Sequence, residues 1–425
     1  MAKPTLLKTR NSMNDSILLS RNGSDRATAY AMSNKILRRH GKLHIGWLDG
    51  PLVAGGLEQI QLGVCDGDTG ELLSVFTLGE GIDNHCGPAL ALDGTGRMHA
   101  IIGAHSTKFL YRWSDDPSDP ASWSIPESMG PFDTYPSLVV DSEDTLHLMS
   151  RESGPHPRKL IYRRKPSGAP WEVPVVIALS PLPGYTHFMQ GLSVGPGGRL
   201  YATFQYHYAL QSHYPAGAVG RLAAVIWSDD SGRTWFQGSG PAVFPLTTDT
   251  TQAFRTAPNG GIRISNHVVD SQDRLWIFSA VPEQPGGILF RFDGSKWTEI
   301  DTSASLGTLD NKNGREISLS RDADGFIHLV IGTVSAGLSA TWRDPRHELF
   351  HLVLDESGRH FSFQQITEAD PSAAHWLPSL ENWSWVRPGC QDGLWMLHTQ
   401  EKSTGEGYPK TDVFLTHLAK VKSIN

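Results

Sequence analysis

The chain has 425 residues, 39% of them hydrophobic, and a formal net charge of −7. This negative charge and the lack of any dense Lys/Arg run argue against a nucleic-acid-binding surface. No stretch reaches the roughly 18 consecutive apolar residues that mark a transmembrane helix. The 43 Gly, 27 Pro and 13 Trp instead indicate many short strands separated by turns, with aromatic side chains packed between them.

Neither the cysteines nor the N-terminus identifies a compartment. Cys65, Cys86 and Cys390 are too few and too scattered for a disulfide framework, and they form no CxxC pair of the kind that binds zinc. Residues 1–15 lack the apolar centre of a secretory signal. We therefore expect either a cytoplasmic protein or one whose signal has been removed, and a monomer with no nucleic-acid or membrane partner.

One strand pattern recurs seven times along the chain. Each copy has a turn residue two or three places before an apolar strand, with His, Tyr or Trp at the same position. The copies are GKLHIGW (41–47), GRMHAII (96–102), DTLHLMS (144–150), GRLYATF (198–204), DRLWIFS (273–279), GFIHLVI (325–331) and DGLWMLH (392–398). Successive copies start between 48 residues (96 to 144) and 75 residues (198 to 273) apart, the size of a four-stranded propeller blade with its loops.

Further strands flank these copies. Preceding strands are YPSLVVD (135–141), GLSVGPG (191–197), SNHVVDS (265–271) and EISLSRD (316–322), and following strands are KLIYRRK (159–165), AAVIWSD (223–229), GILFRFD (287–293) and ELFHLVL (348–354). We predict an all-β fold, a seven-bladed β-propeller of four-stranded antiparallel blades that occupies residues 1–425 as a single catalytic domain. SILLSR (16–21) and DVFLTHL (412–418) are expected to close the ring by completing one blade from both ends of the chain.

Residues 228–235 fit the Asp-box pattern S-x-D-x-G-x-T-W. Such a segment forms a hairpin turn in which Asp and Ser side chains bond to backbone N–H groups, and its Trp packs into the blade. The motif occurs on propeller blades of sialidases and of many unrelated proteins. It therefore indicates the fold and not the function.

Three neighbouring hairpins carry chemically useful side chains at their open ends. DNHCGPALALDGTGRMHAIIGAH (83–105) reads as two strands joined by a tight turn, so it brings His85 and His105 to one edge. TYPSLVVDSEDTLHLMSR (134–151) likewise brings together Tyr135 and Arg151. THFMQGLSVGPGGRLYATFQYHY (186–208) places His187 near Tyr206, His207 or Tyr208. Because the inner strands of all blades run in the same direction, these ends gather on one face around the propeller axis.

This set of side chains suits β-elimination next to a uronic acid carboxylate. An arginine paired with the carboxylate neutralises the enolate that forms when the C5 proton is removed. A base, either His or deprotonated Tyr, takes that proton, and an acid protonates the leaving O4 oxygen. A glycoside hydrolase would need paired carboxylates or a substitute nucleophile, whereas Asp83 and Glu152 have no obvious mates at these hairpin ends.

The first two hairpins resemble those of the seven-bladed propeller polysaccharide lyases of the BNR-repeat superfamily, which include ulvan lyases and L-rhamnose-α-1,4-D-glucuronate lyases. The likeness is strongest from Asp83 to Arg151 and weaker over the remaining repeats. It implies that His85 and His105 match a histidine pair, that Tyr135 matches a catalytic tyrosine, and that Arg151 matches an arginine that neutralises the carboxylate.

Further contacts with an anionic, uronate-containing poly- or oligosaccharide are expected from loops around the same face. The candidates are His187, Tyr206, His207, Arg221 and Arg315. The chemistry requires no cofactor. The resembling families can hold a structural calcium or zinc ion, but no ligand set for such an ion stands out in this sequence.

Each of these side chains also has an ordinary structural interpretation. Tyr135 can be a packing residue before Pro136, and Arg151 can form a surface ion pair with Glu152. His99 and His147 lie inside the strand pattern, and we expect them to be packed structural residues. The joint spacing of the histidine pair and the Tyr–Arg pair favours function for those four.

The preferred function is a polysaccharide lyase that cleaves the 4-linked bond between rhamnose and glucuronic acid, as in ulvan. Which of His85, His105 and Tyr135 is the base and which the acid stays open. The nearest alternative is an exo-acting L-rhamnose-α-1,4-D-glucuronate lyase on gum-arabic-like side chains. Two further hypotheses are a sialidase-like hydrolase, supported by the Asp box alone, and a non-catalytic glycan-binding propeller.

Overall fold

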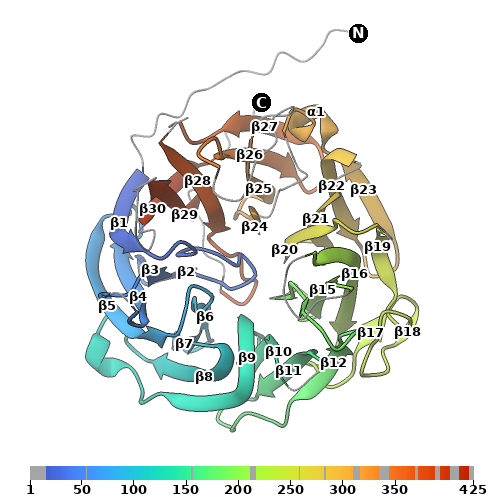
Figure 1. Cartoon of the computed structure of the whole chain (residues 1–425), viewed down its shortest axis with the longest axis horizontal. Coiled ribbons are helices and arrows are strands. Elements are labelled where there is room, and N and C mark those ends of the chain that lie inside the picture. The colour runs from blue at the N-terminus through green and yellow to red at the C-terminus, as the bar shows by residue number, and fades with distance from the viewer. Residues whose placement is uncertain are drawn as a thin grey trace.

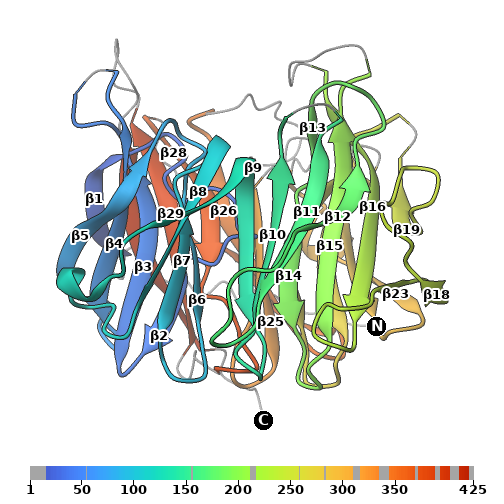
Figure 2. The same cartoon turned by 90° about the horizontal axis from the view of Figure 1, so that it is seen from below.

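Short antiparallel strands make up nearly all the regular structure. The computed structural model describes residues 16–53, 55–154, 157–210, 217–257, 259–281, 284–309, 316–334, 344–368, 372–387, 393–402 and 411–420. Within these residues the strands group into seven blades, and Figure 1 shows them arranged as a ring around a central opening. Viewed side-on, the strands cross the thickness of the ring from one face to the other (Figure 2). The predicted seven-bladed β-propeller is confirmed.

The first three blades follow the chain from the inner strand to the outer strand. Blade 1 contains β2 (Ile36–Arg39), β3 (Lys42–Asp49), β4 (Glu58–Asp66) and β5 (Leu72–Gly81); blade 2 contains β6 (Ala89–Leu92), β7 (Met98–Ile102), β8 (His105–Ser114) and the first half of β9 (Glu127–Val140); blade 3 contains the second half of β9, β10 (Leu146–Glu152), β11 (Lys159–Lys165) and β12 (Val175–Leu179). The long strand β9 pairs with β8 and then with β10, so it joins two blades directly.

The next three blades have the same order, although the outer edge of blade 4 is divided among short strands. Blade 4 contains β13 (Thr186–His187), β14 (Gly191–Val194), β15 (Leu200–Tyr208), β16 (Val219–Ser228), β17 (Phe236–Gln237), β18 (Gly240–Pro241) and β19 (Ala253–Thr256); blade 5 contains β20 (Arg263–Val269), β21 (Leu275–Val281), β22 (Gln284–Phe292) and β23 (Trp297–Asp301); blade 6 contains β24 (Glu316–Arg321), β25 (Phe326–Thr333), β26 (Glu348–Asp355) and β27 (His360–Gln365).

Blade 7 is assembled from both ends of the described chain. It contains β28 (Ala373–Leu380), β29 (Gly393–Lys402), β30 (Thr411–Ala419) and the first strand, β1 (Ser16–Gly23). β1 pairs antiparallel with β30, and the Ser16 and Thr416 hydroxyls are 2.8 Å apart. The predicted joining of the two terminal strands in one blade is therefore confirmed.

All seven recurring strands predicted from the sequence are the second strands of their blades. They are β3, β7, β10, β15, β21, β25 and β29. Only two short helical turns interrupt the strands in the described residues, a 3₁₀ turn at Pro120–Ser122 and α1 at Ser303–Leu306. No helix in the described part of the chain is long and apolar enough to cross a membrane.

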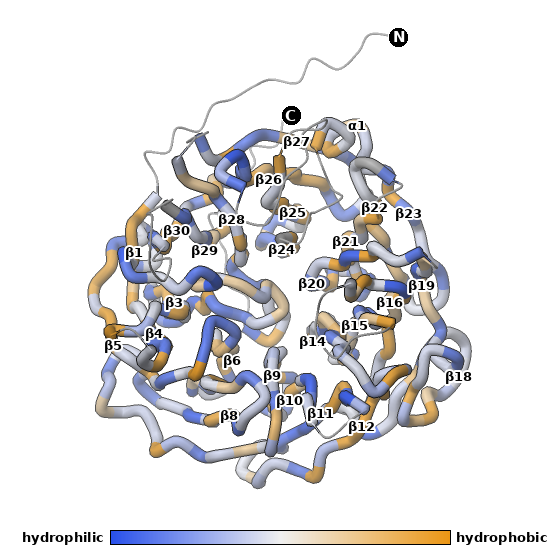
Figure 3. Tube along the Cα trace, in the orientation of Figure 1, coloured by the Kyte–Doolittle hydropathy of each residue, from blue (hydrophilic) through white to orange (hydrophobic). Residues whose placement is uncertain are grey.

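The hydrophobic core lies between neighbouring blades. The largest cluster joins blades 5, 6 and 7, and it contains the buried side chains of Trp276, Phe278, Leu329, Leu352 and Met396. Figure 3 shows hydrophobic and hydrophilic positions alternating along the blades rather than collecting in one block. This alternation follows from the period of two in a strand, and full burial of each such side chain contributes about 1.5–3 kcal/mol.

Aspartates fix the turns between the first and second strands of several blades. These aspartates are Asp93, Asp141, Asp270 and Asp322, and one oxygen of each accepts backbone N–H groups two and four residues later. The other oxygen bonds to a ring six residues later, namely that of His99, His147, Trp276 or His328. The expected structural role of His99 and His147 is thus confirmed.

The predicted Asp box also forms a turn of this kind. Asp230 accepts the backbone N–H groups of Arg233 and Thr234, and its second oxygen accepts the Thr234 hydroxyl. Trp235 is buried and donates its indole N–H to the carbonyl of Gly232. The motif stabilises a turn at the outer edge of blade 4 and contributes no side chain to the site described next.

Candidate active site

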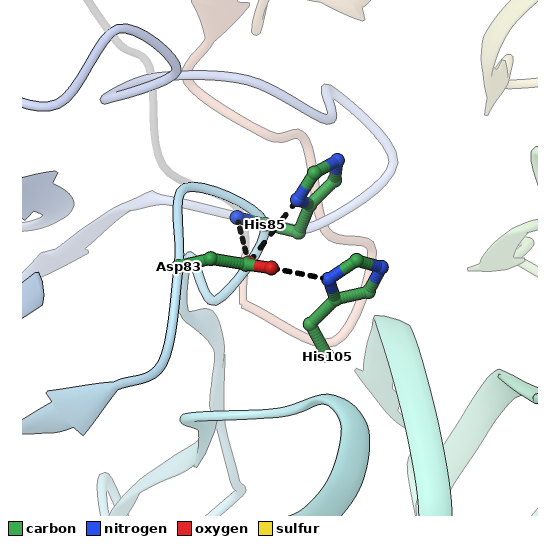
Figure 4. Close-up of side chains that lie close together, drawn as sticks. All are labelled: Asp83, His85 and His105. Atoms are coloured by element: carbon green, nitrogen blue, oxygen red, sulfur yellow. Dashed lines mark hydrogen bonds and ion pairs between the residues drawn. The ribbon is translucent and has the colours of Figure 1, made fainter. Parts of the chain in front are cut away.

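His85 and His105 meet at the open end of the hairpin formed by β6 and β7. These strands pair in register, so the chain leaves the hairpin beside the point at which it entered. The two imidazole rings stack with their centroids 4.1 Å apart and their planes 25° apart. Figure 4 shows both rings facing the carboxylate of Asp83. The hairpin geometry expected from the sequence is therefore what the chain adopts.

Asp83 binds both histidines through different carboxylate oxygens. Its Oδ2 lies 2.5 Å from Nδ1 of His105, and its Oδ1 lies 3.1 Å from Nδ1 of His85 (Figure 4). The backbone N–H of His85 also donates to Oδ1 at 2.9 Å. Burial raises the pKa of Asp83, but the hydrogen bonds from His105 and His85 outweigh that effect and hold the pKa well below its usual range. Asp83 is therefore a fixed negative charge beneath the two rings.

Arg26 determines the tautomer of His85. Its Nη1 lies 3.0 Å from Nε2 of His85, and because a guanidinium only donates, this Nε2 must be an acceptor. The proton of a neutral His85 is then on Nδ1, where it is donated to Asp83. Burial lowers the pKa of His85 to about 4, and the charge on Arg26 acts in the same direction. His85 is thus neutral at physiological pH, and its basic nitrogen is already occupied.

His105 differs from His85 in one respect that matters for chemistry. Its Nδ1 is held by Asp83, whereas no described residue hydrogen-bonds to its Nε2. The side chain is 25% exposed. An Asp-bound imidazole of this kind keeps its proton on Nδ1 and presents a basic Nε2 to a ligand.

Tyr135 and Arg151 also lie side by side, as their positions on β9 and β10 predict. The guanidinium of Arg151 sits over the Tyr135 ring, 4.7 Å from its centroid. Arg151 is only 1% exposed, and it donates to Ser153 and to the backbone carbonyl of Thr186. It forms no surface ion pair with Glu152, whose carboxylate bonds instead to Lys159 at 2.6 Å. Arg151 is therefore a buried cation directly behind Tyr135.

Tyr135 is enclosed by aromatic and charged neighbours. Its ring centroid lies 4.3 Å from that of His187 and 4.7 Å from that of Tyr30, and the residue is 3% exposed. Burial raises the pKa of Tyr135 well above its usual value, and the charge on Arg151 opposes this rise. Burial and the same charge lower the pKa of His187 well below its usual value. Tyr135 is a phenol and His187 a neutral imidazole at physiological pH.

Backbone strain is concentrated around this cluster. Tyr30, Ser106, Tyr135, Met189 and Leu377 have φ angles of 68°, 58°, 59°, 41° and 55°. Non-glycine residues in this left-handed region each cost of order 1–3 kcal/mol, and such residues persist mainly where the surrounding structure fixes them for function.

A central pocket of about 250 Å³ adjoins the cluster. Its lining includes Arg26, Tyr30, Tyr185, His187, His207 and Arg263. Arg26 connects the pocket to the Asp83 cluster through His85, and His187 connects it to Tyr135. No Asp or Glu is among the described residues that line the pocket. In a chain with a net charge of −7, this locally cationic pocket suits an anionic ligand.

The expected subsite residues have different positions. His187 and His207 both line the central pocket, with ring centroids 6.5 Å apart, and Nδ1 of His207 accepts a hydrogen bond from Arg263. The backbone carbonyl of Arg221 on β16 accepts the N–H of Ala257 at 2.9 Å, and its guanidinium lies over the ring of Tyr208, 5.4 Å from the centroid. Arg315 lies outside the described residues.

Tyr206 requires a correction. It is completely buried in the cluster between blades 3 and 4, and its hydroxyl donates to the carbonyl of Leu246. Since successive residues of a strand point to opposite sides, His207 faces the pocket while Tyr206 faces the core. Tyr206 is a packing residue rather than a substrate contact.

Among the charged residues and tyrosines of the pocket lining, four were not predicted: Arg26, Tyr30, Tyr185 and Arg263. Tyr185 lies two residues before His187 at a hairpin end, and Arg263 is the first residue of β20. Both positions are therefore recognisable from the sequence when every hairpin end is considered. Arg26 and Tyr30 lie in the connection between β1 and β2, outside any repeat, and only the fold reveals their position.

Asp83, His85 and His105 are the one group of described residues whose ligand atoms lie within 4.8 Å of one another, as a metal site requires. The set does not fit a structural ion. A structural zinc site has four protein ligands and calcium takes six to eight oxygens, whereas this set offers one carboxylate and two imidazoles. The guanidinium of Arg26, 3.0 Å from His85, also disfavours a second cation there.

The comparison with protein families matches residues 65–305 of the chain to the model described as "BNR repeat-containing family member". This range includes the histidine hairpin, the Tyr–Arg pair and the Asp box. No curated protein matches the chain.

Solved structures with the same architecture include polysaccharide lyases. An ulvan lyase of family PL25 superposes with a TM-score of 0.69 and 14% identity, over 95% of this chain and 96% of that one. A second structure of a PL25 ulvan lyase, bound to -[GlcA(1-4)Rha3S]-, matches with the same figures. The polysaccharide lyase Uly1 matches with a TM-score of 0.58 and 13% identity, over 91% and 90% of the two chains. At these identities the likeness concerns the fold.

Proposed function

This chain belongs to the BNR repeat-containing family, and on the geometry of its central pocket we propose that it is a polysaccharide lyase that cleaves the bond to O4 of a uronic acid by β-elimination. The observation that carries the proposal is the environment of His105. This imidazole is oriented by an ionised Asp83, its Nε2 has no described protein partner, and it stands beside a cationic pocket whose described lining has no carboxylate.

We assign the base to His105. Its Nε2 removes the C5 proton, while the Nδ1–H remains bonded to Asp83, which stabilises the imidazolium that forms. His85 is less suited to this role because Arg26 donates to its Nε2. His85 instead stacks on His105 and helps to hold Asp83 in place.

Positive charge around the pocket stabilises the carboxylate of the uronate and the enolate that follows. Arg151 is the neutralising arginine suggested by the sequence, and its buried guanidinium acts from behind Tyr135. Arg26 and Arg263 supply cationic groups on the pocket surface itself. Charges held in a partly desolvated site act more strongly than they would in water.

The preferred substrate is a polysaccharide with a 4-linked bond between rhamnose and glucuronic acid. Two structures with the same fold are ulvan lyases, and one of them holds a glucuronyl-rhamnose oligosaccharide. The volume of about 250 Å³ is slightly below the range of ligand pockets, which span roughly 300–1,000 Å³. Because the pocket is small, the second candidate is an exo-acting enzyme that removes terminal rhamnose from glucuronate.

Hydrolysis and simple glycan binding have less support. A sialidase-like hydrolase needs an acidic partner for its nucleophilic tyrosine, and the described pocket lining contains none. A binding propeller would not need an Asp-oriented histidine whose second nitrogen has no described partner. We also propose that no metal takes part, so activity after treatment with a chelator and removal of the chelated metal should equal that of untreated protein.

The test is the ultraviolet absorbance of the protein incubated with ulvan and, separately, with gum arabic. Elimination creates a conjugated C4–C5 double bond that absorbs, whereas hydrolysis and binding do not. We expect a rise on one of the two glycans that is lost in His105→Ala and strongly reduced in Arg151→Ala. New reducing ends without absorbance would instead favour a hydrolase. If absorbance rises, the glycan on which it rises distinguishes between the two lyase candidates.

A further inference from the structure

The connection between β1 and β2, residues 24–35, is an ordered part of the site. Ala27 and Thr28 are completely buried, and Ser33 and Lys35 are 2% and 1% exposed. Figure 1 shows this connection reaching from the rim of the ring into the central opening and back. Such burial is unusual for a connection, because most run over the surface.

Hydrogen bonds fasten residues 24–35 to several blades. The hydroxyl of Thr28 donates to the carbonyl of Leu377 on β28 at 2.6 Å. Asn34 donates to the carbonyl of Leu138 on β9 at 3.1 Å, and its own carbonyl accepts the N–H of Leu90 on β6. The buried ammonium of Lys35 donates to the carbonyl of Tyr30 at 2.9 Å. The segment is therefore bonded to blades 2, 3 and 7, and the carbonyl of Tyr30 accepts hydrogen bonds from Lys35 and from the N–H of Ser33.

Residues 24–35 bring Arg26 and Tyr30 to the active-site cluster. Nη1 of Arg26 donates to the Tyr30 hydroxyl at 2.8 Å and to Nε2 of His85 at 3.0 Å. The ring of Tyr30 lies 6.2 Å from that of His85 and 4.7 Å from that of Tyr135. Two side chains from one connection thus link the histidine pair to the tyrosine.

Tyr30 faces the central pocket more directly than Tyr135 does. Tyr30 and Arg26 belong to the pocket lining, whereas Tyr135 is 3% exposed and lies between Tyr30, His187 and Arg151. A proton donor must come within hydrogen-bond reach of the leaving oxygen. Tyr30 lines the pocket and also contacts the histidine pair through Arg26, so it can meet that requirement without rearrangement of the cluster.

We propose that Tyr30 is a further catalytic residue, the acid that protonates the leaving O4 oxygen, and that Arg26 is the positioning residue that holds its hydroxyl. The proposal rests on the lyase function. As His105 removes the C5 proton, the C5–H electron pair forms the C4–C5 double bond. The C4–O4 bond breaks, its electron pair stays on O4, and the Tyr30 proton moves to O4, which leaves a Tyr30 phenolate.

The hydrogen bond from Arg26 prepares Tyr30 for this step. Because a guanidinium only donates, the Tyr30 oxygen accepts from Arg26, and its own proton remains available to the substrate. Burial raises the pKa of Tyr30, and the charge and hydrogen bond of Arg26 oppose that rise. Tyr30 is therefore protonated before the reaction, and the positive charge of Arg26 stabilises the phenolate after it. Proton exchange with solvent then restores the acid.

The experiment compares two uronate substrates, one with a sugar and one with a nitrophenol at O4. A sugar alkoxide needs a proton to leave, whereas nitrophenolate leaves without one. Tyr30→Phe, which removes only the hydroxyl, should be slower by about 100-fold or more on the sugar substrate. It should approach the wild-type rate on the nitrophenyl substrate. His105→Ala should stay slow on both, because loss of the base is not compensated by a better leaving group.

Tyr135→Phe is the matched control, since it removes the same atom from the neighbouring ring. The proposal is overturned if Tyr30→Phe keeps the wild-type rate on the sugar substrate, if it is equally slow on both substrates, or if Tyr135→Phe is the variant that the nitrophenyl group rescues. Thermal unfolding of each variant checks that the fold is retained. A wild-type protein that releases no unsaturated product from either substrate would instead overturn the lyase function itself.

Discussion

The propeller uses Asp–His pairs in two places with opposite consequences. In the turns between first and second strands, His147 donates or accepts at both ring nitrogens, with Asp141 at 3.0 Å and the Tyr162 hydroxyl at 2.6 Å, and its side chain is 0% exposed. At the open end of a hairpin, His105 has Asp83 on one nitrogen, no described partner on the other, and 25% exposure.

The turn histidines repeat this full pairing. His99 bonds to Asp93 and to the Tyr111 hydroxyl, and His328 bonds to Asp322 and to His351. In each case the protein uses the whole hydrogen-bonding capacity of the imidazole to fix a turn. At His105 the same carboxylate pairing fixes only the orientation. The contrast separates Asp–His pairs that use both ring nitrogens inside the protein from the pair at His105, whose second nitrogen has no described partner and is available to a ligand.

The largest expected effect is the fall in lyase rate when the imidazole of His105 is removed. His105→Ala should lower the lyase rate by about 10³-fold or more, since general bases contribute roughly 10²–10⁴-fold. The thermal midpoint should change less than the rate, because the side chain is partly exposed. Turnover measured by product absorbance, beside differential scanning fluorimetry, checks both. Activity that persists in this variant would show that His105 is not the base.

Asp83→Asn should have the next largest effect. The Asn amide offers one oxygen and one NH₂, so it cannot accept hydrogen bonds from both His85 and His105 as the carboxylate does. If the amide donates to His105, the proton of that ring moves to Nε2 and the base is lost. We expect a fall in turnover of about 10²-fold, with KM nearly unchanged. A rise in KM of similar size, with turnover unchanged, would instead indicate a binding role for Asp83.

A turn histidine should show the reverse result. His147→Ala removes a fully buried ring and leaves the Tyr162 hydroxyl without its partner, whereas Asp141 keeps its bonds from Ser231 and from two backbone N–H groups. A cavity and one unsatisfied hydroxyl together should lower the free energy of unfolding by about 2–4 kcal/mol. Urea unfolding measures this loss, and the folded fraction should keep its turnover. Reduced turnover in protein shown to be folded would contradict the separation between the two kinds of pair.

The last prediction concerns the pH dependence of stability. Burial lowers the pKa of His44 to about 4 and the pKa values of His267 and His398 to about 3, whereas an unfolded His titrates near 6.5. Below about pH 6.5 the unfolded chain therefore binds more protons than the folded one, and the free energy of unfolding falls as the pH decreases. The urea midpoint should be lower at pH 5 than at pH 7.5. A midpoint that rises toward pH 5 would contradict this sign.

The sequence predicts the architecture because each blade repeats the same local chemistry. The turn residue and the aromatic or His position of each second strand can be recognised from the local sequence alone. The seven strands predicted from them coincide with β3, β7, β10, β15, β21, β25 and β29. The same regularity predicts that His85 meets His105 and that Tyr135 meets Arg151, since a tight hairpin brings its two ends together.

The features that the sequence does not predict lie outside the repeats or depend on distant contacts. Arg26 and Tyr30 lie in a connection whose path into the central opening depends on bonds to blades 2, 3 and 7. The choice between Tyr206 and His207 depends on which side of β15 faces the axis. The roles of His85 and His105 cannot be separated from the sequence, because they depend on a hydrogen bond from Arg26, 59 residues away from His85.

The measurement that tests the central claim most directly is mass spectrometry of the products formed in heavy-oxygen water. Elimination breaks the bond to O4 without taking up water, so the masses of the two products sum to that of the substrate and neither carries heavy oxygen. We expect this result, together with one unsaturated uronate end per cleavage. Products that contain heavy oxygen and together exceed the substrate by one water would show hydrolysis and contradict it.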